Sequence, residues 1–245
     1  MNPTRERGWD GASVGTVHVV ARRPRWVNST HDWSATVDVQ HLARIRADPT
    51  AFAAGAVVHL VLEVLAYADD EAEDQERRGR VSSVTVHPDG SVAVTDDGRG
   101  TDTRFDDHGE AIRKPVMATR DLRYFDTSPP VLLPVGSPRR GLSVVAALSR
   151  WLVHTNRRPD GSWTQTYDHA LPTTGLTPVP ADGSTGTTVH FLPDTALLEP
   201  QPGAAVLDRI HTHRFSHLAV QVCHAADRRP SPLSRELSPT PRSRL

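Results

Sequence analysis

The chain has 245 residues, 37% of them hydrophobic, and a formal net charge of −1 at pH 7. This length suits one domain, or one and a half, with a sizeable core. The near-neutral charge gives no global electrostatic argument for binding to nucleic acid or to a membrane. A single cysteine, Cys223, excludes an intrachain disulfide and fits a reducing compartment.

No targeting or membrane segment is expected. The N-terminus is polar and lacks the apolar region of a signal peptide. The most apolar stretch, residues 57–68, contains His59 and Glu63, and it is too short and too polar to cross a bilayer. These features predict a soluble, cytoplasmic protein.

Composition divides the chain into three regions. Residues 1–35 are polar and predict a flexible N-terminal arm. Residues 36–229 contain the periodic apolar segments and predict the folded domain. Residues 230–245 are rich in Arg, Ser and Pro and predict a disordered tail.

In the first half of the folded region, helical and strand-like patterns alternate. A short helix is expected over 41–46, ending before Asp48-Pro49. Residues 51–78 predict the clearest helix, because apolar residues recur at helical spacing. Alternating valines over 84–94, broken by a Pro-Asp-Gly turn, predict a hairpin. Residues 101–135 predict a long, lid-like loop with a short helix near 111–119.

In the second half, residues 141–154 carry an apolar stripe and predict a helix. Strands are predicted over 151–155, 163–167 and 187–191, followed by a helix over 204–220 and a last strand over 220–223. This order predicts an α+β fold, with helices layered on one face of a mixed or antiparallel sheet.

The most informative short motif is Asp-Asp-Gly-Arg-Gly at residues 96–100, directly after a predicted strand. Asp96 places a carboxylate at the strand end, where it can accept a hydrogen bond from an adenine amino group. Gly98 and Gly100 let the backbone approach a ligand closely and adopt positive φ. Because Asp-Gly turns are common, this motif on its own is weak evidence for a nucleotide site.

Four segments, taken in order, make the evidence specific. They are the helix 57–65 with Glu63, the turn 96–100, the glycine-bearing loop 136–141 with the helix after it, and the Thr-Gly-Thr-Thr strand at 185–191. Together they resemble the ATPase domain of the DNA gyrase B protein, in the GHKL (Bergerat-fold) family. The resemblance implies a two-layer α/β sandwich, a mixed sheet with helices on one face, and a pocket for ATP.

The resemblance also implies roles for individual residues. Asp96 would bind the adenine amino group, helped by Thr187 and an ordered water, and Glu63 would be the general base that activates the attacking water. The glycines would shape the pocket, and the helix after Gly141 would hold phosphates through free backbone N–H groups. Arg99 would flank the adenine. The residues so assigned to ATP binding are Asp96, Gly98, Arg99, Gly100, Gly136, Gly141 and Thr187.

The chain departs from the family pattern at the phosphate end of the site. Ala66 and Tyr67 stand where the family has Asp and the Asn that ligates Mg²⁺, and a phenol is a poor ligand for this hard cation. Arg139 replaces a glycine of the phosphate loop, where it could attract phosphate or fill the site. Mg²⁺ binding is therefore doubtful, and no metal site is predicted.

Plainer explanations exist for several of these residues. Glu63 could be a paired or surface residue of an otherwise apolar helix. His211, His213, His217 and His224 lack the spacing and partners of a metal site and predict a solvated helix face. Cys223 is expected to be a small buried hydrophobic residue.

Three functions remain open from the sequence. The first is an ATP-binding module like the gyrase B ATPase domain, without the transducer and strand-cleavage domains. The second is a degenerate, non-hydrolysing GHKL protein that binds a nucleotide or ligand and regulates a partner, such as a gyrase-type subunit or a second copy of itself. The third is a pocket that sequesters a small molecule. Whether ATP is turned over stays open, because Tyr67 and Arg139 alter the site.

Overall fold

The computed structural model describes residues 37–74, 80–101, 104–105, 108, 111–112, 115–125, 128–201 and 203–225. The arm predicted over 1–35 and the tail predicted over 230–245 lie outside these residues.

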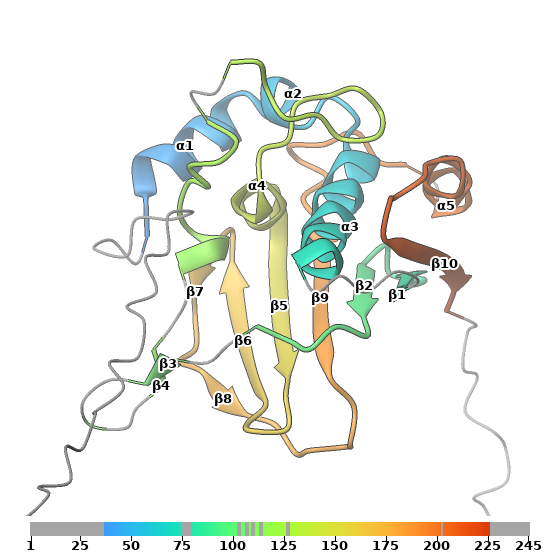
Figure 1. The fold of residues 1–245 in the computed structure, drawn as a ribbon. Coiled ribbons are helices and arrows are strands. Elements are labelled where there is room, and N and C mark those ends of the chain that lie inside the picture. The colour runs from blue at the N-terminus through green and yellow to red at the C-terminus, as the bar shows by residue number, and fades with distance from the viewer. Residues whose placement is uncertain are drawn as a thin grey trace, which may run out of the picture.

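One mixed sheet forms the base of the domain (Figure 1). Its strand order is β10-β1-β2-β9-β5-β6-β7, with β8 paired to β6. β1 and β10 run parallel, whereas the other neighbours are antiparallel. The strands are β1 Arg80–Val86, β2 Val92–Asp96, β5 Ser149–Arg157, β6 Trp163–Asp168, β7 Leu171–Pro172, β8 Thr177–Pro178, β9 Gly186–Pro193 and β10 Leu218–His224. A separate two-stranded sheet pairs β3 Arg104–Phe105 with β4 Ala111–Ile112.

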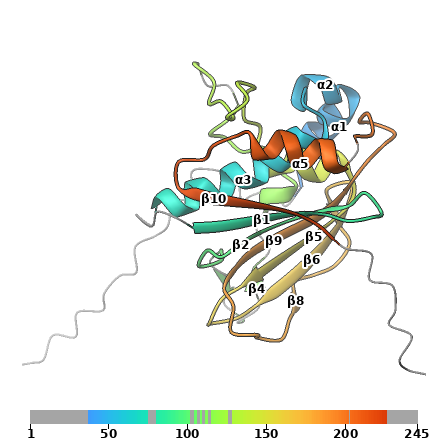
Figure 2. The same cartoon turned by 90° about the vertical axis from the view of Figure 1, so that its right-hand side faces the viewer.

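The helices cover one face of this sheet, as Figure 2 shows. They are α1 Val39–Ala47, α2 Pro49–Phe52, α3 Val57–Asp74, α4 Leu142–Ala147 and α5 Gly203–His211, with the 3₁₀ helix η1 Pro115–Met117. This arrangement confirms the predicted α+β sandwich, a mixed sheet with helices on one face.

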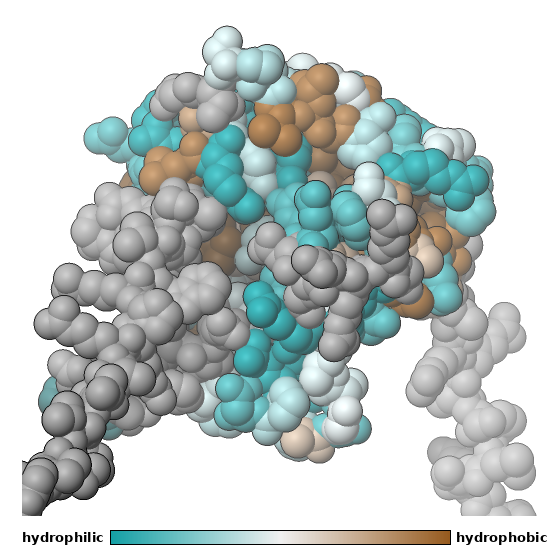
Figure 3. All heavy atoms as spheres, in the orientation of Figure 1, coloured by the Kyte–Doolittle hydropathy of each residue, from teal (hydrophilic) through white to brown (hydrophobic). Residues whose placement is uncertain are grey.

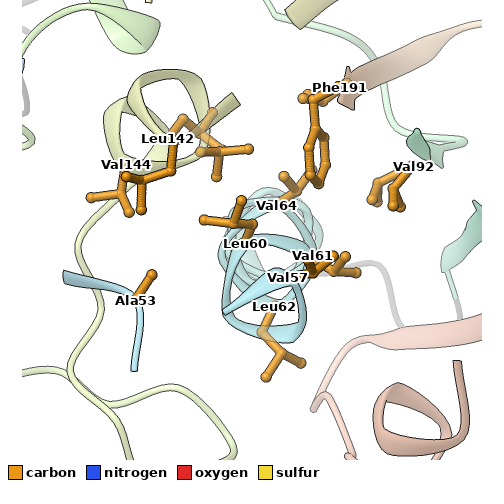
Figure 4. Packing of buried hydrophobic residues seen from close by; sticks show 14 of the residues in the cluster. Ala53, Val57, Leu60, Val61, Leu62, Val64, Val92, Leu142, Val144 and Phe191 are labelled. Atoms are coloured by element: carbon orange, nitrogen blue, oxygen red, sulfur yellow. The ribbon is translucent and has the colours of Figure 1, made fainter. Parts of the chain in front are cut away.

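The core is built around α3, which is apolar on nearly every side. Leu60, Val61 and Leu62 are fully buried although they point in different directions around the helix. Figure 4 shows why: Leu142 of α4 lies on one side of α3, and Phe191 of β9 lies on another. Such an all-round apolar helix is expected at the centre of a packed domain.

The apolar character of this segment also meets a membrane-span criterion. By length and composition alone, Pro49–Glu73 could cross a membrane, but 67% of its most apolar window is buried inside the domain. The core therefore accounts for its hydrophobicity.

The predicted hairpin is confirmed by β1 and β2, and the first short helix by α1. The helix predicted over 51–78 is interrupted, since α2 ends at Phe52 and α3 begins at Val57. Between them, Ala56 adopts a φ of 49°, which an α-helix does not permit. Apolar spacing alone does not detect such a break.

Three predicted helices are wrong in extent. The one over 141–154 ends at Ala147, because β5 pairs with β9 from Ser149 onward and with β6 from Trp151 onward. The one over 204–220 ends at His211, and strand β10 then begins at Leu218. Near 111–119 the structure has β4 and η1 rather than an α-helix.

Cys223 is exposed, so the prediction that it is buried is wrong. It lies on β10, whose one neighbour among the described strands is β1, and there it pairs with Thr85. Because successive side chains of a strand point to opposite faces of the sheet, only every second residue of this apolar run faces the helices. Within the described part of the chain, no group of His, Cys, Asp or Glu side chains is placed to hold a metal ion.

Gly186 fixes the approach of β9 to the end of β2. A Cβ atom there would lie 2.0 Å from the backbone oxygen of Asp96, and the φ of Gly186 is +122°. No side chain fits this position without moving one of the two strands.

We predict that Gly186→Ala lowers the free energy of unfolding by about 3 kcal/mol, from overpacking combined with backbone strain. Gly183→Ala is the matched control, because Gly183 also has positive φ (+79°) but a Cβ there would meet nothing within 4 Å. Its cost is the strain alone, about 1 kcal/mol. Urea denaturation measures both, and equal costs would contradict the close approach.

Candidate functional site

The site lies where α3, the turn after β2, the loop before α4 and strand β9 meet. Asp96 ends β2, and its Oδ1 accepts a hydrogen bond from the backbone N–H of Gly98 at 2.8 Å. The backbone N–H of Thr187 on β9 also donates to the Asp96 carboxylate. A Cβ on Gly98 would lie 2.5 Å from Asp96 Oδ1, so a larger residue there would displace the Asp96 carboxylate. The positive φ predicted for Gly98 is wrong, whereas that predicted for Gly100 is confirmed. The structure thus brings together Asp96, Gly98 and Thr187.

Burial raises the pKa of Asp96 to about 6, and nearby Glu71 and Asp97 add to this effect. The hydrogen bonds from Gly98 and Thr187 act in the opposite direction, because they stabilise the charged form. At neutral pH, Asp96 is therefore mainly an anion that accepts hydrogen bonds.

Arg99 and Gly100 face different neighbours. Arg99 is half exposed, and its Nε donates to Glu71 Oε1 of α3 at 2.6 Å. Gly100 has a φ of +73°, and a Cβ there would lie 2.4 Å from the backbone oxygen of Arg157 on β5. The packing of the turn against β5 is sufficient to explain this glycine.

A small closed cavity adjoins Asp96 and Thr187. Its volume is about 20 Å³, which is room for roughly one water molecule. Ligand pockets usually have about 300–1,000 Å³, so an adenine ring does not fit in this arrangement. The cavity is lined by Val64, Tyr67, Ala68, Val94, Asp96, Thr101, Val116, Met117, Leu142, His154, Thr187 and Val189.

Tyr67 is one wall of this cavity. Burial raises the pKa of its phenol to about 12, with the Glu71 carboxylate as the next cause. The phenol is therefore neutral at physiological pH. Its neighbour Ala66 is buried in the hydrophobic core and offers no oxygen to a metal ion.

Glu63 is fully buried and not a surface residue. Its Oε1 accepts the backbone N–H of Arg140 at 2.5 Å, and its Oε2 accepts that of Gly141 at 3.0 Å. His59, one turn earlier on α3, places its Nε2 3.3 Å from Glu63 Oε1. The carboxylate thus holds the backbone amides at the entrance of α4, a position where an anionic ligand would otherwise bind.

Arg139 fills the space beside Glu63. It is 6% exposed, its Nη1 lies 2.9 Å from both oxygens of Asp70, and its Nε lies 4.0 Å from Glu63 Oε2. The guanidinium stacks over the ring of Tyr124 at 4.2 Å, and the Tyr124 hydroxyl donates to Asp70 Oδ2 at 3.0 Å. In this arrangement the Arg139 guanidinium is engaged by side chains of the domain itself. Arg139, Asp70, Tyr124 and Glu63 are called the arginine cluster below.

The two loop glycines occupy different surroundings. Gly141 is the N-cap of α4 with a φ of 84°, and a Cβ there would lie 3.1 Å from Cβ of Asp121. Gly136 has a φ of 82° in an exposed turn, where its N–H donates to Leu133 O and a Cβ would meet nothing.

Sequence reasoning did not identify His59 and Tyr124 as site residues. His59 precedes Glu63 by four residues, a spacing that places both on one helix face and could have revealed it. Tyr124 comes from the segment with little periodicity, and no pattern in the sequence points to it.

We predict that Asp96 makes folding stability depend on pH. Its folded pKa of about 6 exceeds the unfolded value near 4, so its stabilising contribution is complete below pH 4 and is lost as pH rises through 6. Relative to wild type, Asp96→Asn should therefore gain about 1–3 kcal/mol between pH 4 and pH 7. Urea denaturation at several pH values tests this. Asp97→Asn, at the neighbouring position, is the control, and parallel profiles for wild type and Asp96→Asn would refute the shift.

We predict that Arg139→Met destabilises the domain by about 1–3 kcal/mol, because it removes the guanidinium that lies between Glu63 and Asp70. Asp70 keeps the more distant Arg123, whose Nη1 lies 3.5 Å from its Oδ2. The expected cost is moderate because Asp70 is 36% exposed and therefore partly solvated. Adding Asp70→Leu should recover part of the loss in a double-mutant cycle. Strictly additive costs, measured by thermal unfolding, would show that the two side chains are not coupled.

Comparison with known proteins places this geometry in context. No family model matches the chain. The chain is 36% identical over 148 residues to the mitochondrial DNA gyrase B protein of Arabidopsis thaliana, which covers 56% of this chain and 19% of the relative. It is 29% identical over 205 residues to the DNA gyrase B protein of Streptomyces coelicolor, a match that covers 81% of this chain and 28% of the relative. It is 30% identical over 142 residues to the DNA topoisomerase 4 B protein of Staphylococcus epidermidis, a match that covers 58% of this chain and 21% of the relative.

These matches span between 19% and 28% of the relatives' length. Among solved structures, a topoisomerase IV ATP-binding domain of Francisella tularensis in complex with a small-molecule inhibitor shares the fold. Its TM-score is 0.56 at 19% identity, with 75% of this chain and 50% of that chain covered. The sequence similarity and the shared fold together support a domain of the DNA gyrase B ATPase type in this chain.

Proposed function

We propose that the domain binds an adenine nucleotide through Asp96 and does not hydrolyse it. The observation that carries the proposal is the pairing of Glu63 with the backbone N–H groups of Arg140 and Gly141. A general base and a phosphate-binding loop both have to face the ligand. Here the Glu63 carboxylate and the N–H groups of the loop are hydrogen-bonded to each other instead.

The adenine end of the site supports the binding half of the proposal. Asp96 is a mainly ionised acceptor at neutral pH, and an adenine amino group is a matching donor. Thr187 lies beside Asp96 and lines the same cavity. Because the cavity has only about 20 Å³, nucleotide binding requires a wall to move. The wall formed by Val116 and Met117 belongs to the short 3₁₀ helix η1 rather than to the sheet or to α3.

The end of the site where the family binds Mg²⁺ supports the second half of the proposal, that the nucleotide is not hydrolysed. Mg²⁺ is held by oxygen ligands in near-octahedral geometry. Tyr67 supplies a neutral phenol at the position of the family's Asn, and Asp70 is engaged by Arg139 and Tyr124. Nucleotide binding should therefore be independent of Mg²⁺.

Hydrolysis requires Glu63 to contact a water molecule. Each carboxylate oxygen accepts one backbone hydrogen bond, and the side chain has no exposed surface, so solvent water does not reach it in this arrangement. An active ATPase, the competing function, would need the loop amides to exchange Glu63 for a phosphate.

The biological role that fits is regulation of a partner. Figure 3 shows hydrophobic side chains gathered at the top of the molecule. The loop before α4 exposes Val131, Leu132 and Val135. Exposed apolar patches mark protein contacts more often than chance. We propose a soluble, cytoplasmic protein whose partner is a gyrase-type subunit or a second copy of this chain.

Isothermal titration calorimetry with ATP, a non-hydrolysable ATP analogue and adenosine, each with and without Mg²⁺, tests the nucleotide proposal. We expect ATP affinity to be unchanged by Mg²⁺ and within about tenfold of adenosine affinity, because the phosphates lack the loop amides. No phosphate should be released.

Asp96→Ala should weaken binding by about 10–100-fold through loss of a charge-assisted hydrogen bond, while the neighbouring Asp97→Ala leaves it unchanged. Tight binding that needs Mg²⁺, with phosphate release abolished in Glu63→Ala, would establish the active ATPase instead. No binding of any of the three ligands would refute the nucleotide site.

A further inference from the structure

A second cavity lies at the opposite end of strand β2 from Asp96. It is bounded by the turn between β1 and β2, by the N-terminus of α3, and by the segment that leads from β9 into α5. Figure 2 shows this turn and the start of α5 on the same side of the molecule. The cavity begins at Val92 and the nucleotide site at Asp96, about 13 Å apart along the strand.

The size and walls of this cavity suit a small organic molecule. Its volume is about 470 Å³, within the usual range for ligand sites, whereas the cavity beside Asp96 has about 20 Å³. Its walls are largely apolar, with side chains from both layers of the domain. The apolar wall includes Val57, Val86, Val92, Leu192, Pro200 and Val206.

Two buried polar atoms in the lining residues have no hydrogen-bond partner among the described residues. They are Nε2 of His87 and Oε1 of Gln201. Buried polar atoms are rarely left unpaired, because an unmade hydrogen bond costs free energy. His87 directly follows β1, next to the turn, and Gln201 lies just before α5, so the two residues belong to different segments of the lining.

The charge of the lining limits the ligand further. Asp89, in the turn, is the one Asp, Glu, Lys or Arg among the described residues that line the cavity. Its Oδ1 accepts hydrogen bonds from the backbone N–H and the hydroxyl of Ser91, at 2.9 and 2.7 Å. These bonds hold the pKa of Asp89 below its usual value, so the carboxylate is ionised. The cavity therefore disfavours anions, nucleotides included.

We propose that this cavity binds a small molecule with an apolar body and an N–H donor, either neutral or cationic. To accept from the donor, Gln201 turns its Oε1, which is buried in this arrangement, toward the cavity. The apolar body packs on the valines, and Asp89 favours a positive charge at the rim. Binding here does not depend on nucleotide binding, because the two cavities share no lining residue.

The test compares two probes that share one ring and differ in charge. Tryptamine carries an ammonium group and indole-3-acetate a carboxylate, and both carry the same indole N–H. Titrations followed in ¹H–¹⁵N NMR spectra should shift the amides of Gly90, Gln201 and Ala204 with tryptamine. Indole-3-acetate should bind about tenfold more weakly or not at all. Equal affinities, or no binding of tryptamine, would overturn the proposal.

A matched pair of variants tests the location. Ala204 lines the cavity and Ala205 does not, and both are exposed on α5. Ala204→Trp should abolish tryptamine binding, whereas Ala205→Trp should leave it unchanged. Equal affinity in the two variants would contradict the site.

Two polar variants test the recognition without filling the cavity. Gln201→Leu and Asp89→Asn should each weaken tryptamine about tenfold, and unchanged affinity in both would overturn the assigned contacts. A saturating non-hydrolysable ATP analogue should leave tryptamine affinity unchanged, and competition between the two would place both ligands in one site.

Discussion

The structure depends on one buried carboxylate, that of Glu63, in the middle of an apolar helix. Moving such a group out of water costs several kcal/mol, so it has to be compensated locally. Two backbone N–H groups at the start of α4 provide the compensation, and each such bond to a charged group contributes about 1.5–3 kcal/mol. In return the carboxylate fixes the start of α4, and α4 in turn leads directly into β5 in the middle of the sheet. The position of α4 over α3 is thus set by the same contact that occupies the candidate catalytic base.

This contact divides the site into two ends with different chemistry. At the end of β2, Asp96 and Thr187 remain arranged around a cavity and present an ionised acceptor. At the start of α4, the arginine cluster places Arg139 between Asp70 and Glu63, where an anionic ligand would otherwise find positive charge and free amides. Arg139 is buried and Asp70 is partly solvated, so the cost of separating them is moderate, and a phosphate would still have to displace this network. Under the proposed function, Asp96 would recognise the base, whereas the filled phosphate end would prevent turnover.

Much of this could be predicted from the sequence. The apolar periodicity of α3 and the alternating valines of the hairpin encode the two layers directly, and the order of four motifs indicated the fold. The end of α4 could not be predicted, because the stripe from Leu142 to Leu152 suits either a helix or a buried strand, and only pairing with β9 decides between them. Likewise, the sequence showed that Arg139 was unusual. Whether it would recruit a phosphate or replace one depended on Tyr124 and Asp70, which are 15 and 69 residues away in the chain.

The N–H groups of Arg140 and Gly141 are central to this division of the site, and amide hydrogen exchange observes each of them individually. Both amides should be protected in the free protein and keep their exchange rates and chemical shifts when a non-hydrolysable ATP analogue with Mg²⁺ is added. Rapid exchange of these amides in the free protein, or a large shift with the analogue that adenosine does not cause, would contradict this expectation. Either result would show that the amides are available to phosphate.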